Sequence, residues 1–204
     1  MDPGLASFAK ILDPQVSARG AKYALIEHDK NLPTFRGYEV GDGKLRIIIG
    51  DKTQPTFSPF GMSTFNNDDS QRKNIEFVLT PTDEDKVNRV YDWALGYLAS
   101  QPDRFFKKPV AKDELLELFK HPVVKKEQYA PKLKCKIDTI GKNAVRCWDA
   151  QGQRCELPSD LRGYKLVPKI TFNHIWFMSK ECGIVCLCSD LLILECASEE
   201  CPFE

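Results

Sequence analysis

The chain has 204 residues, 42% of them hydrophobic and 28% charged, a composition typical of a folded globular protein with one substantial core. No apolar run is long enough to span a bilayer, and the N-terminus lacks a basic flank followed by an apolar signal core, so we expect a soluble intracellular protein. The formal net charge of zero hides a polar distribution, because residues 104–146 carry twelve bases against five acids and the last fifteen residues carry five acids and no base.

The first eighty residues are rich in strand signals. Residues 21–29 and 43–50 are β-rich and flank a turn-rich stretch, and residues 73–80 alternate between polar and apolar side chains. Residues 54–65 contain the prolines and the glycine of an irregular edge or bulge. We therefore predict three strands and one irregular segment in this part of the chain.

The hydrophobic period then changes from two to that of a helix. Between residues 84 and 101 the apolar side chains recur at helical spacing, which predicts one long helix with Thr82 and Asp85 at its N-terminal cap. A second, shorter helix is predicted over residues 111–121, bounded by Pro109 and Pro122. Together these elements form a helical insertion between strands.

Strand signals return over residues 132–138, 143–149, 165–179 and 183–194. About seven short strands around one helical insertion predict a mainly β protein, an OB-fold-like antiparallel barrel or a sandwich with one long and one short helix between strands. We divide the chain into an N-terminal arm, an OB-fold-like domain with a helical insertion at 82–121, and an acidic C-terminal tail, which cover residues 1–20, 21–194 and 195–204.

The eight cysteines are predicted to be reduced thiols. Cys182, Cys186 and Cys188 lie within one apolar run, where strand alternation puts the last two on the same face. Their spacing differs from that of zinc sites, and the three histidines form no paired motif. We expect buried small thiols and no metal.

Motifs of catalysis are missing from the sequence, which has no phosphate-binding glycine loop, no dinucleotide fingerprint, no nucleophile elbow and no zinc-protease motif. Asp68 and Asp69 lie in a polar stretch that suits an exposed hairpin loop better than a two-carboxylate metal site. His174, beside Trp176, has no identifiable catalytic partner. We expect no enzyme and no cofactor, while an enzyme whose site is assembled from dispersed residues stays open.

Binding chemistry is concentrated in the basic third of the chain. Lys132, Lys134 and Lys136 are two residues apart, so a strand would direct all three ammonium groups to one face. Cations interleaved with rings are what a single nucleic-acid strand needs, for phosphates and for stacked bases respectively. The alternative is that the lysines are solvated strand positions and the rings belong to the core. The further candidates in this region are Lys125, Lys126, Tyr129, Arg146 and Trp148.

Several segments resemble a known family. These are "IIIGDKTQPTFSPFGMSTF", "FFKKPVAKDELLELFKHPVVKK", "YAPKLKCKID" and "KLVPKITFNHIWFMSKECGIVCLCSDLLIL". In this order they resemble the OB-fold single-stranded DNA-binding proteins of large nucleocytoplasmic DNA viruses, which are related to the podophage replication protein of the same function. The resemblance extends from about Lys44 to Leu194. It implies an OB barrel that coats single-stranded DNA during replication, recombination or repair, in the nucleus or at a cytoplasmic viral replication site.

The resemblance adds candidate residues at two places. Phe57 and Phe60 in the P-F-G segment become candidates for base contacts. The acidic, aromatic-tipped C-terminus is similar to a tail that occupies the DNA groove when it is empty and otherwise binds a replication polymerase, helicase or primase. The matching tail residues are Glu195, Glu199, Glu200, Phe203 and Glu204.

The sequence also departs from the family pattern. Cys182 and Cys186 stand where relatives tend to carry an aromatic residue before the glycine and a tryptophan after it, and the tail is short. A divergent OB-fold structural or adaptor protein that has lost DNA binding and docks on a protein partner is therefore the alternative. A homodimer formed by exchange of the C-terminal strand stays open.

Overall fold

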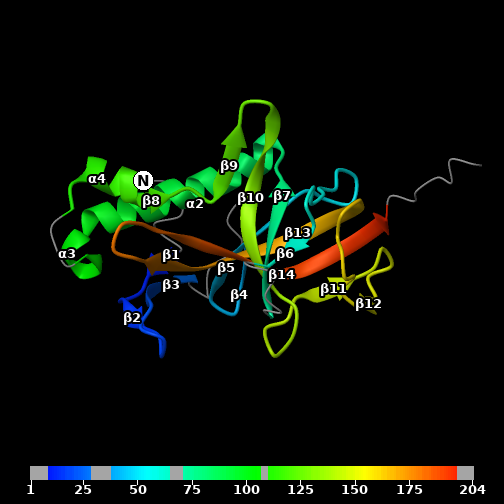
Figure 1. The fold of residues 1–204 in the computed structure, drawn as a ribbon, viewed down its shortest axis with the longest axis horizontal. Coiled ribbons are helices and arrows are strands. Elements are labelled where there is room, and N and C mark those ends of the chain that lie inside the picture. The colour runs from blue at the N-terminus through cyan, green and yellow to red at the C-terminus, as the bar shows by residue number, and fades with distance from the viewer. Residues whose placement is uncertain (1–8, 29–37, 65–70, 107–109, 197–204) are drawn as a thin grey trace, which may run out of the picture.

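The computed structural model describes residues 9–28, 38–64, 71–106 and 110–196. These residues form one sheet of fourteen strands, together with three helices (Figure 1). None of the described helices has the length and apolar character of a membrane-spanning segment. The elements in chain order are β1 (Ala9–Ile11), β2 (Gln15–Val16), β3 (Lys22–His28), β4 (Tyr38–Gly41), β5 (Lys44–Ile48), β6 (Met62–Ser63), β7 (Arg72–Val78), α2 (Pro81–Ser100), α3 (Pro102–Phe105), α4 (Lys112–Leu118), β8 (Phe119–Lys120), β9 (Val123–Lys126), β10 (Tyr129–Asp138), β11 (Arg146–Trp148), β12 (Arg154–Cys155), β13 (Tyr164–Phe177) and β14 (Cys182–Cys196).

The hairpin of β13 and β14 contains the two longest strands of the sheet and extends over most of the long axis of the molecule in Figure 1. Strands β3 and β5 pair with β13, and β8, β10 and β11 pair with β14 in parallel. All other pairs among the described strands are antiparallel. The predicted mainly β, OB-fold-like architecture with a helical insertion is confirmed, with these parallel pairs added to the expected antiparallel barrel.

The barrel closes through the irregular segment that follows β5. Thr56 exchanges backbone hydrogen bonds of 2.9 and 2.8 Å with Leu166 of β13. On its other side, Thr56 Oγ1 donates to the carbonyl of Val78 in β7 at 2.5 Å, and Val78 N donates to the carbonyl of Phe57 at 3.1 Å. This segment therefore joins β7 to β13.

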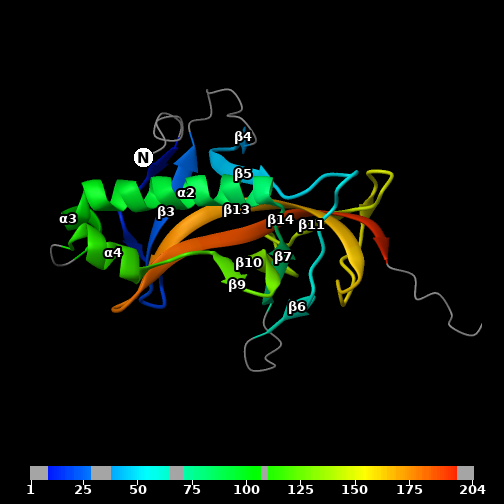
Figure 2. The same ribbon diagram turned by 90° about the horizontal axis from the view of Figure 1, so that it is seen from above.

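Helix α2 runs roughly parallel to the long axis of the β13–β14 hairpin (Figure 2). The predicted apolar stripe is buried, since Val87, Val90, Ala94 and Leu98 are all fully covered. The hydroxyl of Tyr38, itself fully buried in β4, donates to the carbonyl of Lys86 at 2.7 Å and ties the helix to the sheet. Burial of this stripe, more than helix propensity, stabilises the helix.

The predicted N-terminal cap of this helix is wrong by two residues. Thr80, and not Thr82, is the cap, since its Oγ1 accepts from the backbone N of Asp83 at 3.1 Å. Pro81 has the fixed backbone angle suited to the first helical position, so the helix begins before Thr82.

The second helical region differs from the prediction at both ends. Helix α4 covers Lys112–Leu118 and not 111–121, because Phe119 and Lys120 leave the helix to pair with β14 as strand β8. The short helix α3 was not predicted. The division of the chain into arm, domain and tail stays a prediction.

Candidate nucleic-acid interface

Strand β10 directs its three lysines to the side of the sheet away from the core. Because side chains alternate along a strand, Lys132, Lys134 and Lys136 share one face. The residues between and after them are at most 4% exposed and fill the core, namely Leu133, Cys135 and Ile137. The three lysines nevertheless have different surroundings.

Lys132 is held within the protein. It is 8% exposed, its Nζ lies 3.2 Å from Glu76 Oε2, and the same ammonium lies 4.3 Å from the centre of the Phe60 ring. Lys134 is exposed, and Lys136 Nζ donates to Asn74 Oδ1 at 2.5 Å. Lys134 and Lys136 are therefore better placed than Lys132 to contact a phosphate.

Lys136 has two cations nearby, Lys134 and Arg72, and Arg72 is itself paired with both carboxylate oxygens of Asp138 at 2.5 and 2.7 Å. Burial lowers the pKa of the Lys136 ammonium, and the nearby charges of Arg72 and Lys134 lower it further. The pKa of His174 is lowered by burial as well and by Arg72 to a smaller extent. An anion bound here would relieve this repulsion, since an opposite charge favours the protonated form of a lysine.

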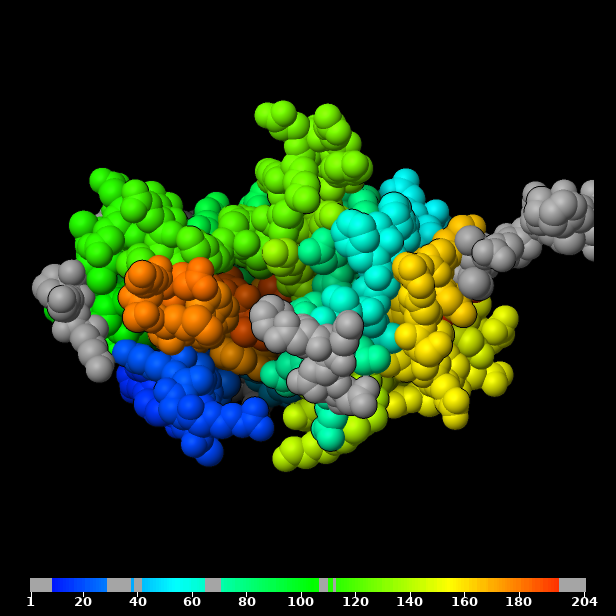
Figure 3. Space-filling view, in the orientation of Figure 1, coloured from blue at the N-terminus to red at the C-terminus, as the bar shows by residue number. Residues whose placement is uncertain are grey.

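Lys134 and Lys136 line a cleft of about 740 Å³. The cleft lies where β14 changes its parallel partner. Strand β8 pairs with Cys182 and Gly183 of β14, and β10 pairs further along with Leu187 and Cys188. In Figure 3 the hollow lies between the orange tip of the β13–β14 hairpin and the green and teal surface of β10, β7 and β6.

One indole borders the cleft. Trp176 of β13 lies directly opposite Gly183 of β14. A Cβ atom added to Gly183 would lie 3.1 Å from Trp176 Cζ2, 3.2 Å from its Nε1 and 3.2 Å from the carbonyl oxygen of Lys120. The glycine thus lets the ring lie close against the strand.

The cleft carries an excess of positive charge. Lys120, Lys134 and Lys136 line it, with Glu76 as the acid among the lining residues. The charge of Glu76 is offset by its ion pair with Lys132. A groove with cations on its walls and an aromatic ring beside them provides the two kinds of contact that a nucleic-acid strand uses.

The β9–β10 hairpin projects from the body of the protein (Figure 1). Lys125 of β9 forms an ion pair with Glu84 of α2, which lowers the pKa of that carboxyl through a hydrogen bond. Lys126 is exposed, and Tyr129, its partner across the hairpin, is 68% exposed. The hairpin therefore presents the ammonium of Lys126 and the ring of Tyr129 to solvent, next to the paired Lys125 and the exposed Glu127 of the turn.

Phe57 and Phe60 flank the end of β7 in the closing segment. Their exposed fractions are 49% and 63%, which is unusual for phenylalanine. Phe60 contacts Lys132 and thereby lies near the row of β10 lysines. Both rings stay candidates for base contacts.

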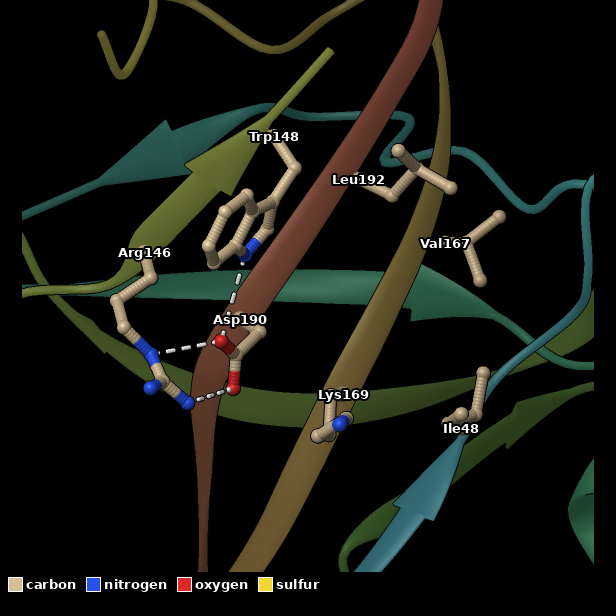
Figure 4. Close-up of a pocket in the computed structure, with 7 residues that line it drawn as sticks. All are labelled: Ile48, Arg146, Trp148, Val167, Lys169, Asp190 and Leu192. Atoms are coloured by element: carbon tan, nitrogen blue, oxygen red, sulfur yellow. Dashed lines mark hydrogen bonds and ion pairs between the residues drawn. The ribbon is translucent and has the colours of Figure 1, made fainter. Parts of the chain in front are cut away.

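Arg146 and Trp148 lie in a separate pocket of about 370 Å³ on β11 and β14 (Figure 4). The guanidinium of Arg146 binds both carboxylate oxygens of Asp190, and Trp148 Nε1 donates to the same carboxylate at 3.4 Å. The structure therefore divides the predicted residues among the cleft, the hairpin, the closing segment and this pocket.

The tail residues Glu199, Glu200, Phe203 and Glu204 lie outside the described residues, as do Asp68 and Asp69. Strand β14 continues to Cys196, so the backbone of Glu195 belongs to the strand. Its side chain is not among those described.

Cys182 and Cys186, the two departures from the pattern of the family that the sequence resembles, are 1% and 2% exposed. Burial raises the pKa of both thiols to about 12, so they are protonated at neutral pH. Six described cysteines are free thiols, and no described group of three histidine, cysteine or acidic residues could hold a metal ion. With cysteines at positions 182 and 186, the indole beside the cleft is that of Trp176 on the neighbouring strand β13.

Sequence reasoning missed several residues of the cleft. Trp176 could have been found, because it alternates with the buried Ile175 and therefore faces away from the core. Lys120 gave no signal, since it was placed in a helix. The proximity of Arg72 to Lys136 depends on the pairing of β7 with β10, in which Asn74 lies opposite Lys136.

Neither protein-family models nor curated protein sequences match this chain. Among solved structures it is similar to gp2.5, a single-stranded DNA-binding protein encoded by bacteriophage T7, with 11% identity over 76% of this chain and 89% of that one and a TM-score of 0.53. This chain shares the fold of the T7 protein. At that identity the likeness shows the fold alone.

The single-stranded DNA-binding protein of bacteriophage Enc34 is also similar. Its complex with single-stranded DNA matches 89% of this chain and 94% of that one with 8% identity and a TM-score of 0.45. Its DNA-free form matches 90% and 89% with 7% identity and a TM-score of 0.41. The expected likeness to a phage protein holds for the fold on the match to the T7 protein, and kinship with large DNA viruses stays a prediction.

Proposed function

We propose that this protein binds single-stranded DNA without a defined sequence and coats it during replication, recombination or repair. The observation that carries the proposal is the cleft where β14 changes from β8 to β10 as its parallel partner. Lys120, Lys134 and Lys136 line this cleft together with Trp176. The OB-fold likeness to the T7 protein supports it. No step of this role requires a catalytic group.

Each part of the cleft has a role in this proposal. The three lysines neutralise phosphates, and the Trp176 ring stacks on a base, a contact worth about 1–3 kcal/mol. Single strands are favoured over duplex because stacking on a side-chain ring requires a base with an exposed face. Lys126 and Tyr129 on the projecting hairpin extend the path of the strand, with Phe57 and Phe60 at the end of β7.

The acidic tail is proposed to imitate DNA. Its carboxylates and Phe203 would compete for the cations and stacking surface of the cleft, and would be released to a replication polymerase, helicase or primase when DNA binds. We also propose that the protein descends from the single-stranded DNA-binding proteins of large DNA viruses and that it can form a homodimer.

One observation favours the alternative of an adaptor that docks on a protein partner. Three of the predicted phosphate contacts are already paired within the protein, namely Lys125 with Glu84, Lys132 with Glu76 and Arg146 with Asp190. These pairs reduce the number of cations that can reach DNA.

A fluorescent oligonucleotide titration separates the two roles. We expect the protein to bind a thymidine oligonucleotide. Duplex DNA and RNA should compete poorly with that oligonucleotide for the protein. If the four lysines of the cleft and the hairpin contact phosphate, affinity falls roughly 50-fold between about 50 and 200 mM salt. No binding at either salt concentration would select the adaptor.

A further inference from the structure

Tyr23 of β3 lies beside the indole of the cleft. In the antiparallel pair of β3 and β13, Tyr23 lies directly opposite Trp176, and Trp176 in turn lies opposite Gly183 of β14. Residues directly opposite each other on neighbouring antiparallel strands direct their side chains to the same face of the sheet. Tyr23 therefore shares a face with the Trp176 indole, one strand further from the lysines of β10.

The burial pattern of the two strands agrees with this orientation. Ala24 and Ile26 of β3 are buried in the core, whereas Tyr23 is half-buried. The same alternation on β13 buries Ile175, opposite Ala24, and leaves Trp176 half-buried. Because side chains alternate along a strand, both rings face away from the core.

The Tyr23 ring is held by two neighbours. Its hydroxyl donates to Gln15 Oε1 of β2 at 2.9 Å, and the ring meets the imidazole of His174 edge to face, with centres 5.6 Å apart and planes at 69°. The imidazole is itself held, since its Nδ1 lies 2.9 Å from Asn173 Nδ2. An edge-to-face contact covers at most one face of a ring. The half-buried Tyr23 ring therefore keeps surface on which a base can stack.

The Trp176 and Tyr23 rings lean to opposite sides. The indole lies against Gly183 of β14, whereas the Tyr23 hydroxyl reaches Gln15 of β2, on the other side of β3. The two rings therefore follow one another along a line that crosses the strands from β14 to β2. Neighbouring bases of a strand on this line would each meet one ring.

Exposed cations lie at the same end of the sheet. Lys22 pairs with Phe177, so the turn that precedes β3 and the tip of the β13–β14 hairpin are neighbours. The turn contains Arg19 and the tip contains Lys180, both exposed, with Glu181 as the acid of the tip. In Figure 3 the blue surface of the first strands adjoins the orange tip of the hairpin, next to the hollow of the cleft. The region thus offers cations for the phosphates of a strand that leaves the cleft.

We propose that Tyr23 is a second base-stacking residue and that single-stranded DNA continues from Trp176 in the cleft over β13 onto β3. Stacking on a side-chain ring tolerates any sequence, because every base has a π face. The inference rests on the proposed single-stranded DNA binding and adds to it a second ring and the direction of the strand across the sheet.

The test is photochemical cross-linking of the wild-type protein to thymidine oligonucleotides of about 15 nucleotides, a length within the range bound by OB folds. One thymine is replaced by 5-iodouracil, which on irradiation cross-links to an aromatic side chain in contact with it, and peptide mass spectrometry identifies the residue. We expect cross-links to both Trp176 and Tyr23. An excess of unmodified oligonucleotide should suppress both.

Variants at the same position separate the ring from the hydroxyl. Tyr23→Leu should raise Kd about fivefold, the low end for one stacked base. Tyr23→Phe keeps the ring, and Gln15→Ala removes only the partner of the hydroxyl, so both should bind like wild type. Thermal unfolding shows whether each variant is folded, and the cross-link in wild type tests the inference even if Tyr23→Leu does not fold.

The outcomes distinguish this inference from the proposed function. If wild type binds no oligonucleotide, both are overturned. If it binds but no cross-link reaches Tyr23, the second stacking residue is overturned while single-stranded DNA binding stands. An unchanged Kd in folded Tyr23→Leu, or an equal loss in Tyr23→Phe, would also overturn it.

Discussion

Trp176 lies over Gly183 so closely that a single methyl group would crowd it. The Cβ of an alanine at position 183 would come within 3.1 Å of the indole. Real Cβ atoms rarely have so close a neighbour, so the ring or the strand would have to shift. The absence of a side chain on one strand thus positions the ring on the other.

Gly183→Ala should therefore weaken DNA binding indirectly, because the added methyl group displaces the Trp176 ring. We expect Kd for a thymidine oligonucleotide to rise about three- to tenfold, which is part of the stacking contribution of one base. In the Trp176→Ala background the same substitution should have little further effect, as a double-mutant cycle would report. Additive effects of the two substitutions would show that Gly183 acts independently of the ring.

Lys132 is predicted to act in stability and not in phosphate binding. Lys132→Met removes the ion pair with Glu76 and the contact with Phe60, so urea unfolding should show a loss of about 1–3 kcal/mol. Lys134→Met, at an exposed position of the same face, serves as the matched control and should change stability little. If Lys132→Met keeps wild-type stability and its DNA affinity depends less steeply on salt, Lys132 contacts phosphate and the assignment to stability is wrong.

Burial makes five of the six described thiols slow to react. The pKa of Cys147 is raised to about 11 and that of Cys182 and Cys186 to about 12, so few of these groups are thiolates at pH 8. Among the six described cysteines, the half-buried Cys155 should be alkylated first by iodoacetamide, as peptide mass spectrometry would show. Rapid alkylation of Cys186 would contradict its burial.

Removal of the acidic tail should tighten DNA binding. Truncation after Cys196 keeps strand β14 intact and removes three glutamates together with Phe203. We expect Kd to fall about threefold or more at low salt, since a competing polyanion is lost. A full-length variant with all three glutamates changed to glutamine separates the effect of charge from that of the ring, and weaker binding after truncation would refute the competition.

Much of the fold was predictable because its signals are local. The alternation that places Lys132, Lys134 and Lys136 on one face and the helical stripe of α2 can both be read from neighbouring residues. The cleft could not be predicted, because it depends on how β14 exchanges β8 for β10 as its parallel partner. Period-two patterns are the same for parallel and antiparallel strands.

Charge pairing limited the site prediction in the same way. Glu76 and Asp190 neutralise Lys132 and Arg146 from other strands, and these contacts follow from sheet register. A count of lysines and arginines along the chain therefore overstates the number of cations available to DNA.

Lys134 and Lys136 are proposed to contact phosphate in the cleft. The most direct test is the salt dependence of oligonucleotide affinity for Lys134→Gln/Lys136→Gln, compared with the control Lys10→Gln/Lys52→Gln, whose lysines are exposed and lie outside the cleft. We expect the plot of log K against log salt to be shallower by about 1.4 for the cleft variant, or about 0.7 for each lost contact, and unchanged for the control. Equal slopes for the cleft variant and wild type would contradict this proposal.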